Sequence, residues 1–424
     1  MLPGDARDVK RDDPDRTRRR AVAAMAFATG VVIANNYYAQ PLEAAIADEF
    51  GASSSAVGAV LTLIQLAYAL GLATLVPLGD LLERRRLTVA MLSVVVLGQL
   101  VVAIAPTLAV LAAAAATVAL LTVAAQVLVP FAAHLAPEGQ QGKVISTVMS
   151  GLLIGVLLSR VVAGLVSELV GWRAVFVLGA LLTAVAAVLL WRTLPVLAPA
   201  ARMRYPALLR SVLVLVREEP VLRWRMAYSA SSYAAFGAVW TSIGFLLAGQ
   251  PYHLSDALIG LFSLFGVAGA LGARFAGRLA DRGQAHAAVG VFLALTALSF
   301  VALGWGGSSL VALAVGLIVF DLGVQGVHIS NQTIVYALLP EARSRLNSAY
   351  MTVYFLGGAT GSGMSAWVYS LHGWAGVAVL GAAFPAVGLL LWLIDTVRRR
   401  RRDQAGGRRP GGGRISVAGS TRTR

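Results

Sequence analysis

The sequence predicts an all-α polytopic membrane protein with twelve transmembrane helices in two pseudo-symmetric six-helix bundles. Hydrophobic residues fill 58% of its 424 positions and charged residues only 13%, which is more apolar surface than one water-soluble core could bury. Twelve apolar runs reach the roughly 18 residues that a helix needs to cross a bilayer. Matching features recur in the two halves at offsets of 201 to 203 residues.

The apolar runs follow one another along the whole chain, separated by polar connections. The first run follows a basic stretch, as in a secretory signal, but it is too long and eleven more runs follow it. We therefore expect it to be retained as the first helix. The twelve expected spans are 21–43, 56–79, 87–107, 108–136, 144–169, 174–192, 226–248, 257–277, 287–306, 309–337, 346–371 and 374–395.

The basic residues are distributed unevenly between the connections. With an even number of spans both termini lie on one side, and 33 of the 35 lysines and arginines fall in the tails or in and around the connections on that same side. This excess marks the cytoplasmic face, so we expect a multi-pass protein of the bacterial inner membrane with both termini cytoplasmic. The net charge of +15 thus reflects orientation in the lipid bilayer, and no nucleic-acid partner is expected.

The constant offset indicates a duplication of six helices in parallel. Asp80 and Asp281, each after an even-numbered span, are 201 residues apart, and the Gly-Trp pairs that begin at Gly171 and Gly373 are 202 apart. Between the halves, a segment with an amphipathic pattern predicts a helix on the membrane surface. The expected parts are a disordered basic tail at 1–20, bundles at 21–194 and 223–397, a cytoplasmic linker at 195–222 and a second disordered basic tail at 398–424.

Three segments carry a resemblance to a known family. Residues 277–283 (GRLADRG) are similar to the loop motif Gly-x-Leu-x-Asp-Arg-x-Gly-Arg-Arg of the major facilitator superfamily, and residues 76–85 (VPLGDLLERR) keep its acid and basic pair. Residues 35–42 (NNYYAQPL) match the Asn-x-Tyr-Tyr-x-Gln-Pro-Leu signature of a bacterial branch described as predicted efflux permeases. The chain resembles this superfamily over roughly residues 20–397.

The resemblance implies the major facilitator fold and secondary active transport. A small organic solute such as a drug, sugar or metabolite would move by alternating access, most simply by proton-coupled efflux through an antiporter. Two alternatives stay open, an uptake symporter on the same fold and a transport-inactive membrane sensor or scaffold. The expected partners are the solute, protons and the lipid bilayer, and we expect a monomer.

The two loop motifs predict a cytoplasmic gate. A carboxylate at a helix end can accept hydrogen bonds from the exposed amides at the N-terminus of a neighbouring helix. Asp80 would then meet the start of the eleventh span and Asp281 the start of the fifth. In the alternative interpretation the neighbouring arginines only set the orientation. The expected gate residues are Asp80, Arg84, Arg85, Asp281 and Arg282.

The fifth span carries small residues four apart, which lets two helices approach closely. The same device recurs in the eleventh span, and the predicted packing residues are Gly151, Gly155, Gly164, Gly357 and Gly361. Arg160 lies near the middle of the fifth span, where family antiporters more often have proline. An unpaired charge is costly at that depth, so Arg160 needs a partner, a water-filled cavity or a fixed structural ion pair.

In the family, helices 1, 4, 7 and 10 line the cavity, and polar residues of this chain form helical stripes on three of them. Such stripes suit a moderately polar organic molecule, although they could also hold helices together. The expected cavity residues are Asn36, Gln40, Gln126, Ser229, Tyr233, Trp240, Gln325 and Gln332.

Asp321 and His328 are the titratable pair on one face of the tenth span, and either could carry a coupled proton. Depth along the spans suggests Arg160 as the partner of Asp321, because both lie near the midplane. Arg160 could instead face the eighth span or bind an anionic substrate. Glu43 is a third proton-coupling candidate, but at the outer end of the first span it is expected to be solvated.

Other classes of function lack their required groups. The chain has no cysteine, its five histidines are scattered, and no Gly-x4-Gly-Lys-Ser/Thr sequence occurs. These absences argue against a metal site, an enzyme and a nucleotide-driven pump. We therefore expect no cofactor and no catalytic residue.

Overall fold

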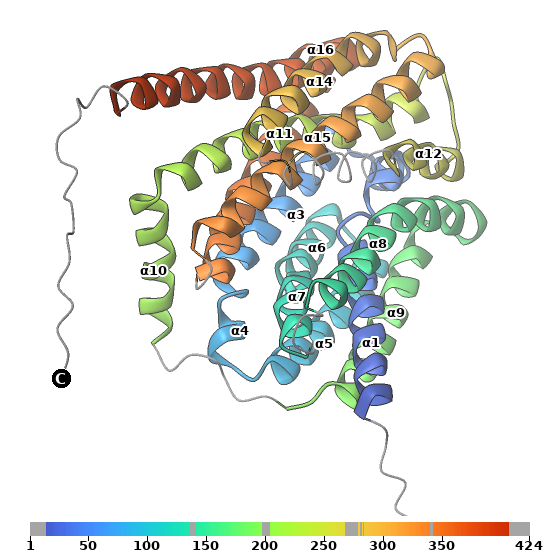
Figure 1. Cartoon of the computed structure of the whole chain (residues 1–424). Coiled ribbons are helices and arrows are strands. Elements are labelled where there is room, and N and C mark those ends of the chain that lie inside the picture. The colour runs from blue at the N-terminus through green and yellow to red at the C-terminus, as the bar shows by residue number, and fades with distance from the viewer. Residues whose placement is uncertain are drawn as a thin grey trace, which may run out of the picture.

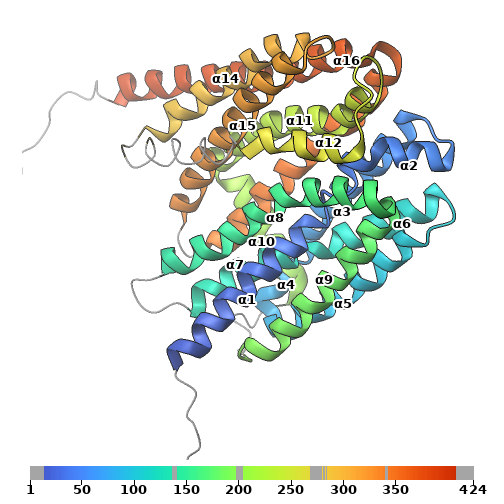
Figure 2. The same cartoon turned by 90° about the vertical axis from the view of Figure 1, so that its right-hand side faces the viewer.

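The computed structural model describes residues 14–135, 141–196, 204–267, 279, 282, 284–339 and 342–406, and this part of the chain is helical apart from its turns and connections. Helices of the first half and helices of the second half form two groups, one above the other in both views (Figures 1 and 2). The amphipathic helix α10 (Tyr205–Glu218) lies at the side of these groups.

The first group begins with α1 and ends with α9. Polar side chains cap the N-termini of its helices at two connections. Ser53 accepts a hydrogen bond from the backbone N–H of Ala56, and the Glu83 carboxylate accepts hydrogen bonds from the backbone N–H groups of Arg85 and Arg86. These side chains cap otherwise unpaired amides. The elements are α1 (Pro14–Ala34), the 3-10 turn η1 (Gln40–Leu42), α2 (Glu43–Phe50), α3 (Ser54–Thr74), α4 (Leu78–Leu81), α5 (Arg84–Ala103), α6 (Leu108–Thr122), α7 (Ala124–Leu135), α8 (Gln141–Val170) and α9 (Trp172–Thr193).

The second group follows α10. Its elements are α11 (Pro220–Ala248), α12 (Asp256–Phe262), η2 (Ser263–Val267), α14 (Ala285–Trp305), α15 (Leu310–Leu338) and α16 (Arg343–Gly406). The 64-residue α16 is divided at Gly373, whose φ of 59° lies in the left-handed region. Gly171, between α8 and α9, also has a positive φ, of 95°. Only glycine adopts such angles without strain, so both sharp reversals depend on it.

Among the described residues, nine helices are long and apolar enough to span a membrane. One of them, from Arg345 to Arg401, is 57 residues long, more than twice what a single span requires. Many large apolar side chains on these helices are exposed, including Leu169 at 81% and Val379 at 74%. Apolar surface of this extent belongs in lipid, so the protein is a multi-pass membrane protein. The number twelve stays a prediction.

The two groups of helices meet along two seams. In one seam α3 packs against the first part of α16, where Thr62 donates to Ser362 at 3.3 Å and Ser348 donates to the Leu72 carbonyl at 2.7 Å. Both views show α3 reaching the second group (Figures 1 and 2). In the other seam the end of α8 packs against α12. The first bundle therefore contributes α3 and α8 to the junction, and the second contributes α16 and α12.

The α8–α12 seam closes one end of the junction, and we call it the closed end. Ser167 donates a 2.6 Å hydrogen bond to Asp256, while the Glu168 carboxylate accepts from Ser255 at 2.7 Å and from the backbone N–H of Ala257 at 3.2 Å. A side chain on Gly164 would overlap the Asp256 carbonyl oxygen. These contacts join the two bundles directly.

Candidate functional site

The first helix is interrupted beside the junction of the two bundles. α1 ends at Ala34, and the chain passes through turns before η1 begins at Gln40. Pro41 contributes to the break because it has no N–H to donate and because, in a continuous helix, its ring would clash with the carbonyl four residues earlier. Irregular backbone inside a membrane protein is tolerated where it is buried in protein or lines a cavity. The break brings Tyr37 and Gln40 to the site.

Arg160 of α8 lies at the centre of this site. It is only 4% exposed, its Nε donates a 2.8 Å hydrogen bond to Gln40 Oε1, and its guanidinium carbon lies 4.8 Å from the Tyr37 ring centre and 4.3 Å from that of Trp240. Aromatic faces stabilise a guanidinium by cation–π attraction. Arg160 Nη2, however, is buried without a hydrogen-bond partner among the described residues.

Asp321 of α15 approaches the same place from the second bundle. It is 3% exposed, and its Oδ2 has no hydrogen-bond partner in the part of the chain that the structure describes. This oxygen and the Trp240 ring both border Gly266. The charges of Arg160 and Asp321 interact through space, but no hydrogen bond joins the two side chains in this conformation. Their pairing stays a prediction.

Two small cavities lie at the junction, and Gln40 lines both. In the larger cavity, the centre of a water molecule can occupy a volume of about 20 Å³. This is enough for about one water molecule. It is lined by Asn36, Tyr37, Gln40, Ile64, Gln65, Tyr68, Tyr233, Phe236, Gly237 and Phe355. The other cavity is bordered by Gln40, Pro41, Arg160, Trp240, Ile243, Leu247, Ile259, Phe262 and Ser263. In this conformation the site is contracted around its polar groups.

The structure brings together only some of the expected cavity residues. Those on the two cavities are Asn36, Gln40, Tyr233 and Trp240, with Arg160 beside them. Gln126 lies beside Tyr68, one of the cavity residues. Gln332 instead donates to Tyr336 at 3.0 Å, and Gln325 is half-buried on α15 and lines neither of these two cavities.

Ser229 and His328 belong to a hydrogen-bonded chain inside the second bundle. Ser229 accepts from Asn331 at 3.0 Å and lies 2.6 Å from the Tyr350 hydroxyl, which lies 3.2 Å from His328 Nδ1. The His328 ring also packs on Tyr354 at 4.6 Å. His328 is therefore held by aromatic side chains of α16 on the same face of α15 as Asp321, two helical turns away.

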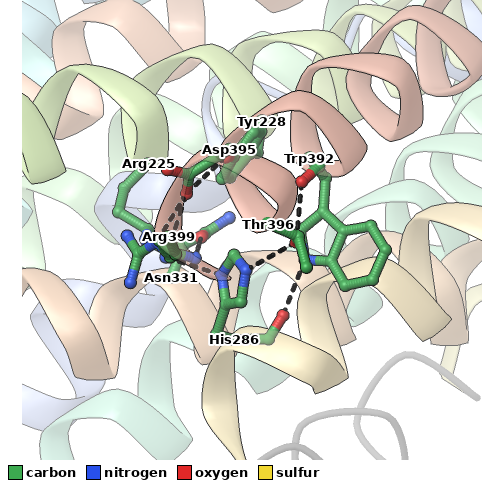
Figure 3. Close-up of polar contacts among 8 residues, drawn as sticks. All are labelled: Arg225, Tyr228, His286, Asn331, Trp392, Asp395, Thr396 and Arg399. Atoms are coloured by element: carbon green, nitrogen blue, oxygen red, sulfur yellow. Dashed lines mark hydrogen bonds and ion pairs between the residues drawn. The ribbon is translucent and has the colours of Figure 1, made fainter. Parts of the chain in front are cut away.

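A second cluster of charges, which the sequence patterns did not identify, lies at one end of the second bundle (Figure 3). Arg225 is fully buried and contacts His286 at 2.8 Å and Asn331 at 3.3 Å, with Asp395 at 4.0 Å. Tyr228 donates to the Asp395 carboxylate at 2.9 Å. These residues come from α11, α14, α15 and α16, so the cluster ties four helices together. The signal for this cluster in the sequence was that Arg225 and Asp395, near the two ends of the second bundle's sequence, carry opposite charges.

Glu43 differs from expectation. We expected a solvated carboxylate, but Glu43 has no exposed surface, and neither of its oxygens has a hydrogen-bond partner among the described residues. It begins α2 and packs against α11, where a side chain on Gly244 would lie 3.2 Å from Glu43 Oε2. The expectation of a solvated group was wrong because counting along a helix gives depth in the membrane but not contact with the other bundle.

Each predicted packing glycine faces the backbone of another helix. Side chains on Gly151 and Gly155 would overlap Ala26 and Gly30 of α1, and those on Gly357 and Gly361 would overlap α11. Gly164 is different because its close neighbour, α12, belongs to the second bundle.

The expected gate is only partly described. The side chain of Asp80 and all of Asp281 lie outside the described residues. Arg84 is buried and donates to the Gly79 carbonyl at 2.8 Å, whereas Arg282 is exposed. Arg85 donates to the Leu194 carbonyl at 3.1 Å, so it ties the start of α5 to the end of α9. Its guanidinium also lies 4.2 Å from the Trp191 ring centre.

Several functional candidates were missed in the sequence. Tyr37, Gln65, Tyr68 and Phe355 border the larger cavity, and they lie outside the stripes that the sequence analysis identified. Gln65 was visible as a polar residue inside an apolar span, but the aromatic residues resemble ordinary core residues in sequence. Their common location depends on how α3 and α16 cross.

A helical membrane protein with two bundles and a buried polar site at their junction is a membrane transporter in architecture. The Major Facilitator Superfamily matches the chain over residues 25–282 and 229–421, and the chain belongs to this family. It is 48% identical over 371 residues to the "Putative uncharacterized transporter YgaY" of Escherichia coli (strain K12), covering 88% of this chain and 94% of that protein. It is 36% identical to the "Probable transporter SCO4007" of Streptomyces coelicolor over 379 residues, covering 89% and 87%.

Solved structures share the fold at low sequence identity. A mutant of the nucleoside transporter NupG aligns with a TM-score of 0.72 and 14% identity, covering 88% of this chain and 99% of that chain. The human organic anion transporter MFSD10 aligns with a TM-score of 0.67 and 19% identity over the same shares. The chain is thus a transporter of the major facilitator type and not an enzyme, and its cargo is a small molecule.

Proposed function

We propose that the protein is a proton-coupled secondary transporter that moves a small organic solute by alternating access across the bacterial inner membrane, with both termini in the cytoplasm. The observation that carries the proposal is the pair of buried charges, Arg160 and Asp321, at the junction of the two bundles. Family membership supports transport. The coupling and the orientation are our inference from the site and from the basic connections.

The case for a proton rests on the surroundings of Asp321. An ionised carboxylate that is buried without a partner is costly, so the group becomes neutral instead. When the bundles rock apart and water reaches the site, the same group can ionise. A carboxyl group that is alternately buried and hydrated takes up a proton in one arrangement and releases it in the other. Asp321 has the location for this exchange.

Alternating access requires the two ends of the junction to open in turn. The contacts of Ser167, Glu168 and Asp256 hold the closed end, which we assign to the outside. On the cytoplasmic side we propose that Asp80 and Asp281 make the corresponding helix-end contacts, with the neighbouring arginines, when that side closes. Opening either end must break one set of contacts, so the solute would be exposed to one side at a time.

The direction of transport depends on how proton and solute share the site. If they exclude each other, the protein is an antiporter and exports its solute, as the resemblance to efflux permeases suggests. If they bind together, it is a symporter and takes the solute up. A transport-inactive sensor would bind solute without flux, and flux in proteoliposomes separates it from both.

The test begins with untargeted metabolite analysis of cells with and without the protein, which identifies a cargo. In proteoliposomes a pH gradient should then drive that cargo uphill, and Asp321→Asn should abolish this drive while leaving exchange of labelled for unlabelled cargo intact. An amide cannot release the proton, but it preserves the shape of the site.

Glu218→Gln is the matched control, because Glu218 is an exposed carboxylate at the end of α10. It should transport like the parent. The proposal fails if Asp321→Asn keeps full proton-driven accumulation, or if the parent catalyses no flux of any compound whose level it changes in cells.

A further inference from the structure

Arg160 is a buried cation to which no carboxylate among the described residues forms a hydrogen bond or close ion pair. A guanidinium stays protonated in proteins, so Arg160 cannot lower its burial cost by losing its charge. It has one hydrogen bond, to Gln40, and its Nη2 has no partner among the described residues. The cavity at this group is bordered by Gln40 and Trp240. A cation in this state is a ready site for an anion.

We propose that Arg160 binds the carboxylate, or a similar planar anionic group, of an aromatic solute, and that Asp321 competes with the solute for the same guanidinium. This inference rests on the proposed function, because it identifies the chemical class of the transported solute. The parts of the site that carry it are the Nη2 edge of Arg160, the rings around it and the buried carboxyl group of Asp321.

The rings leave one direction open for binding. Tyr37 and Trp240 lie against the guanidinium at 4.8 and 4.3 Å from their ring centres. Because the aromatic groups and Gln40 already engage it elsewhere, the free Nη2 remains for a ligand. Arginine binds carboxylates through hydrogen bonds in the plane of its fork. A carboxylate bound to Nη2 would leave the observed contacts of Arg160 in place once the contracted site opens.

The rest of the junction suits a flat apolar body. Tyr233 and Phe236 stack with ring centres 5.0 Å apart, and Tyr233 and Tyr354 stack at 3.8 Å. Tyr233 and Phe236 line the larger cavity, together with Phe355. Such walls favour ring stacking. We therefore place the anionic end of the solute at Arg160 and its ring among these aromatic residues.

Asp321 couples this binding to a proton. When Asp321 is neutral, Arg160 has no internal competitor and is available to the solute. When Asp321 is ionised, its charge attracts the same guanidinium and repels an anion. The other titratable groups that act on the pair are Tyr37, Tyr233 and Tyr354, and tyrosines are neutral near pH 7. Proton and solute thus bind together, which favours uptake by symport over efflux.

The first test measures binding by the purified full-length protein in detergent at constant ionic strength. Six probes form two matched sets: benzoate, benzamide and benzylamine, and indole-3-acetate, indole-3-acetamide and tryptamine. At pH 6, at least one carboxylate should raise the unfolding temperature and bind in calorimetry, while its amide and amine counterparts do not. Arg160→Gln should weaken carboxylate binding at least about tenfold, and Arg210→Gln, at an exposed arginine of α10, should not.

The second test uses Asp321 and remains informative if Arg160→Gln fails to fold. Between pH 5.5 and 8, carboxylate affinity of the parent should fall at least about tenfold, within the usual range of coupling between two sites. Asp321→Asn should bind at every pH as tightly as the parent does at low pH. Loss of the pH dependence together with tight binding is a result that a merely structural role would not produce.

The inference is overturned if no carboxylate binds, if amides or amines bind as tightly, or if Asp321→Asn binds more weakly than the parent. Proton-driven transport of a neutral or cationic solute would support the proposed function while overturning this inference. Arg160-dependent carboxylate binding without any flux would support this inference while overturning the proposed function. The two proposals can therefore fail separately.

Discussion

At the scale of single residues, the site is defined by buried charged groups that lack full pairing. Arg160, Asp321 and Glu43 are each 4% exposed or less, and each has a side-chain atom without a hydrogen-bond partner in the described part of the chain. Burial of such groups is expensive in one conformation. Burial of these groups is tolerable if water reaches them in another conformation of the protein. We therefore interpret Arg160, Asp321 and Glu43 as groups whose surroundings change during transport.

Glu43→Gln should favour the closed end. Glu43 packs against Gly244 of α11 without a partner among the described residues, so its ionised form opposes closure and a neutral amide of similar size does not. Because the chain has no cysteine, Ala257→Cys can report access to the buried closed end. Its labelling by an impermeant maleimide at pH 7.5 should slow at least about fivefold, as roughly 1 kcal/mol of added preference requires.

Ser308→Cys, at an exposed position between α14 and α15, corrects for the reactivity of the reagent. Its labelling should not respond to Glu43→Gln. Equal labelling of Ala257→Cys in parent and variant would show that the charge of Glu43 has no part in closure.

At the scale of elements, helices were predictable and their crossings were not. The apolar runs predicted most helices, because the length and composition of a span follow from the bilayer. The break after Ala34 could have been inferred from Pro41. In contrast, the sequence does not show that Gly164 faces α12 of the other bundle while Gly155 faces α1 of its own bundle. These partners depend on the tilt of α8. A pattern of small residues indicates a close contact but not the partner.

The closed end should weaken as pH rises. Burial raises the pKa of Asp256 at the start of α12, and the nearby charges of Glu168 and Asp48 add to this, while the hydrogen bond from Ser167 opposes it. The closed arrangement therefore binds the proton more tightly than an open, hydrated one. Closure is strongest below the ordinary aspartate pKa of about 4 and is lost as pH rises through the raised value.

Labelling of Ala257→Cys, divided at each pH by that of Ser308→Cys, should increase over this range. Asp256→Asn should remove the part of the increase that depends on this group, because an amide stays neutral while it can still accept the hydrogen bond from Ser167. A pH profile that is identical in Asp256→Asn and the parent would exclude this carboxylate from closure.

At the scale of the whole molecule, composition and repetition predicted the fold class, and the resemblance of three motif segments predicted the family. The site was predicted less completely. Of the expected cavity residues, Asn36, Gln40 and Tyr233 line one cavity, but Ser229 points into its own bundle, toward Asn331 and Tyr350. A polar face on a helix is compatible with a cavity or with packing inside a bundle, and only the tertiary arrangement distinguishes them.

The last prediction concerns orientation of the whole molecule in the membrane. Gly171, at the turn between α8 and α9, follows an odd number of expected spans, whereas Arg400, near the end of α16, follows all twelve. The basic residues around Arg400 should hold that end in the cytoplasm, so a fusion there should give fluorescent green fluorescent protein and inactive alkaline phosphatase. A fusion after Gly171 should give the opposite pair of signals. The same pair at both positions would refute the assignment of spans, while exchanged pairs would keep the spans and invert the protein, moving the closed end to the cytoplasmic side.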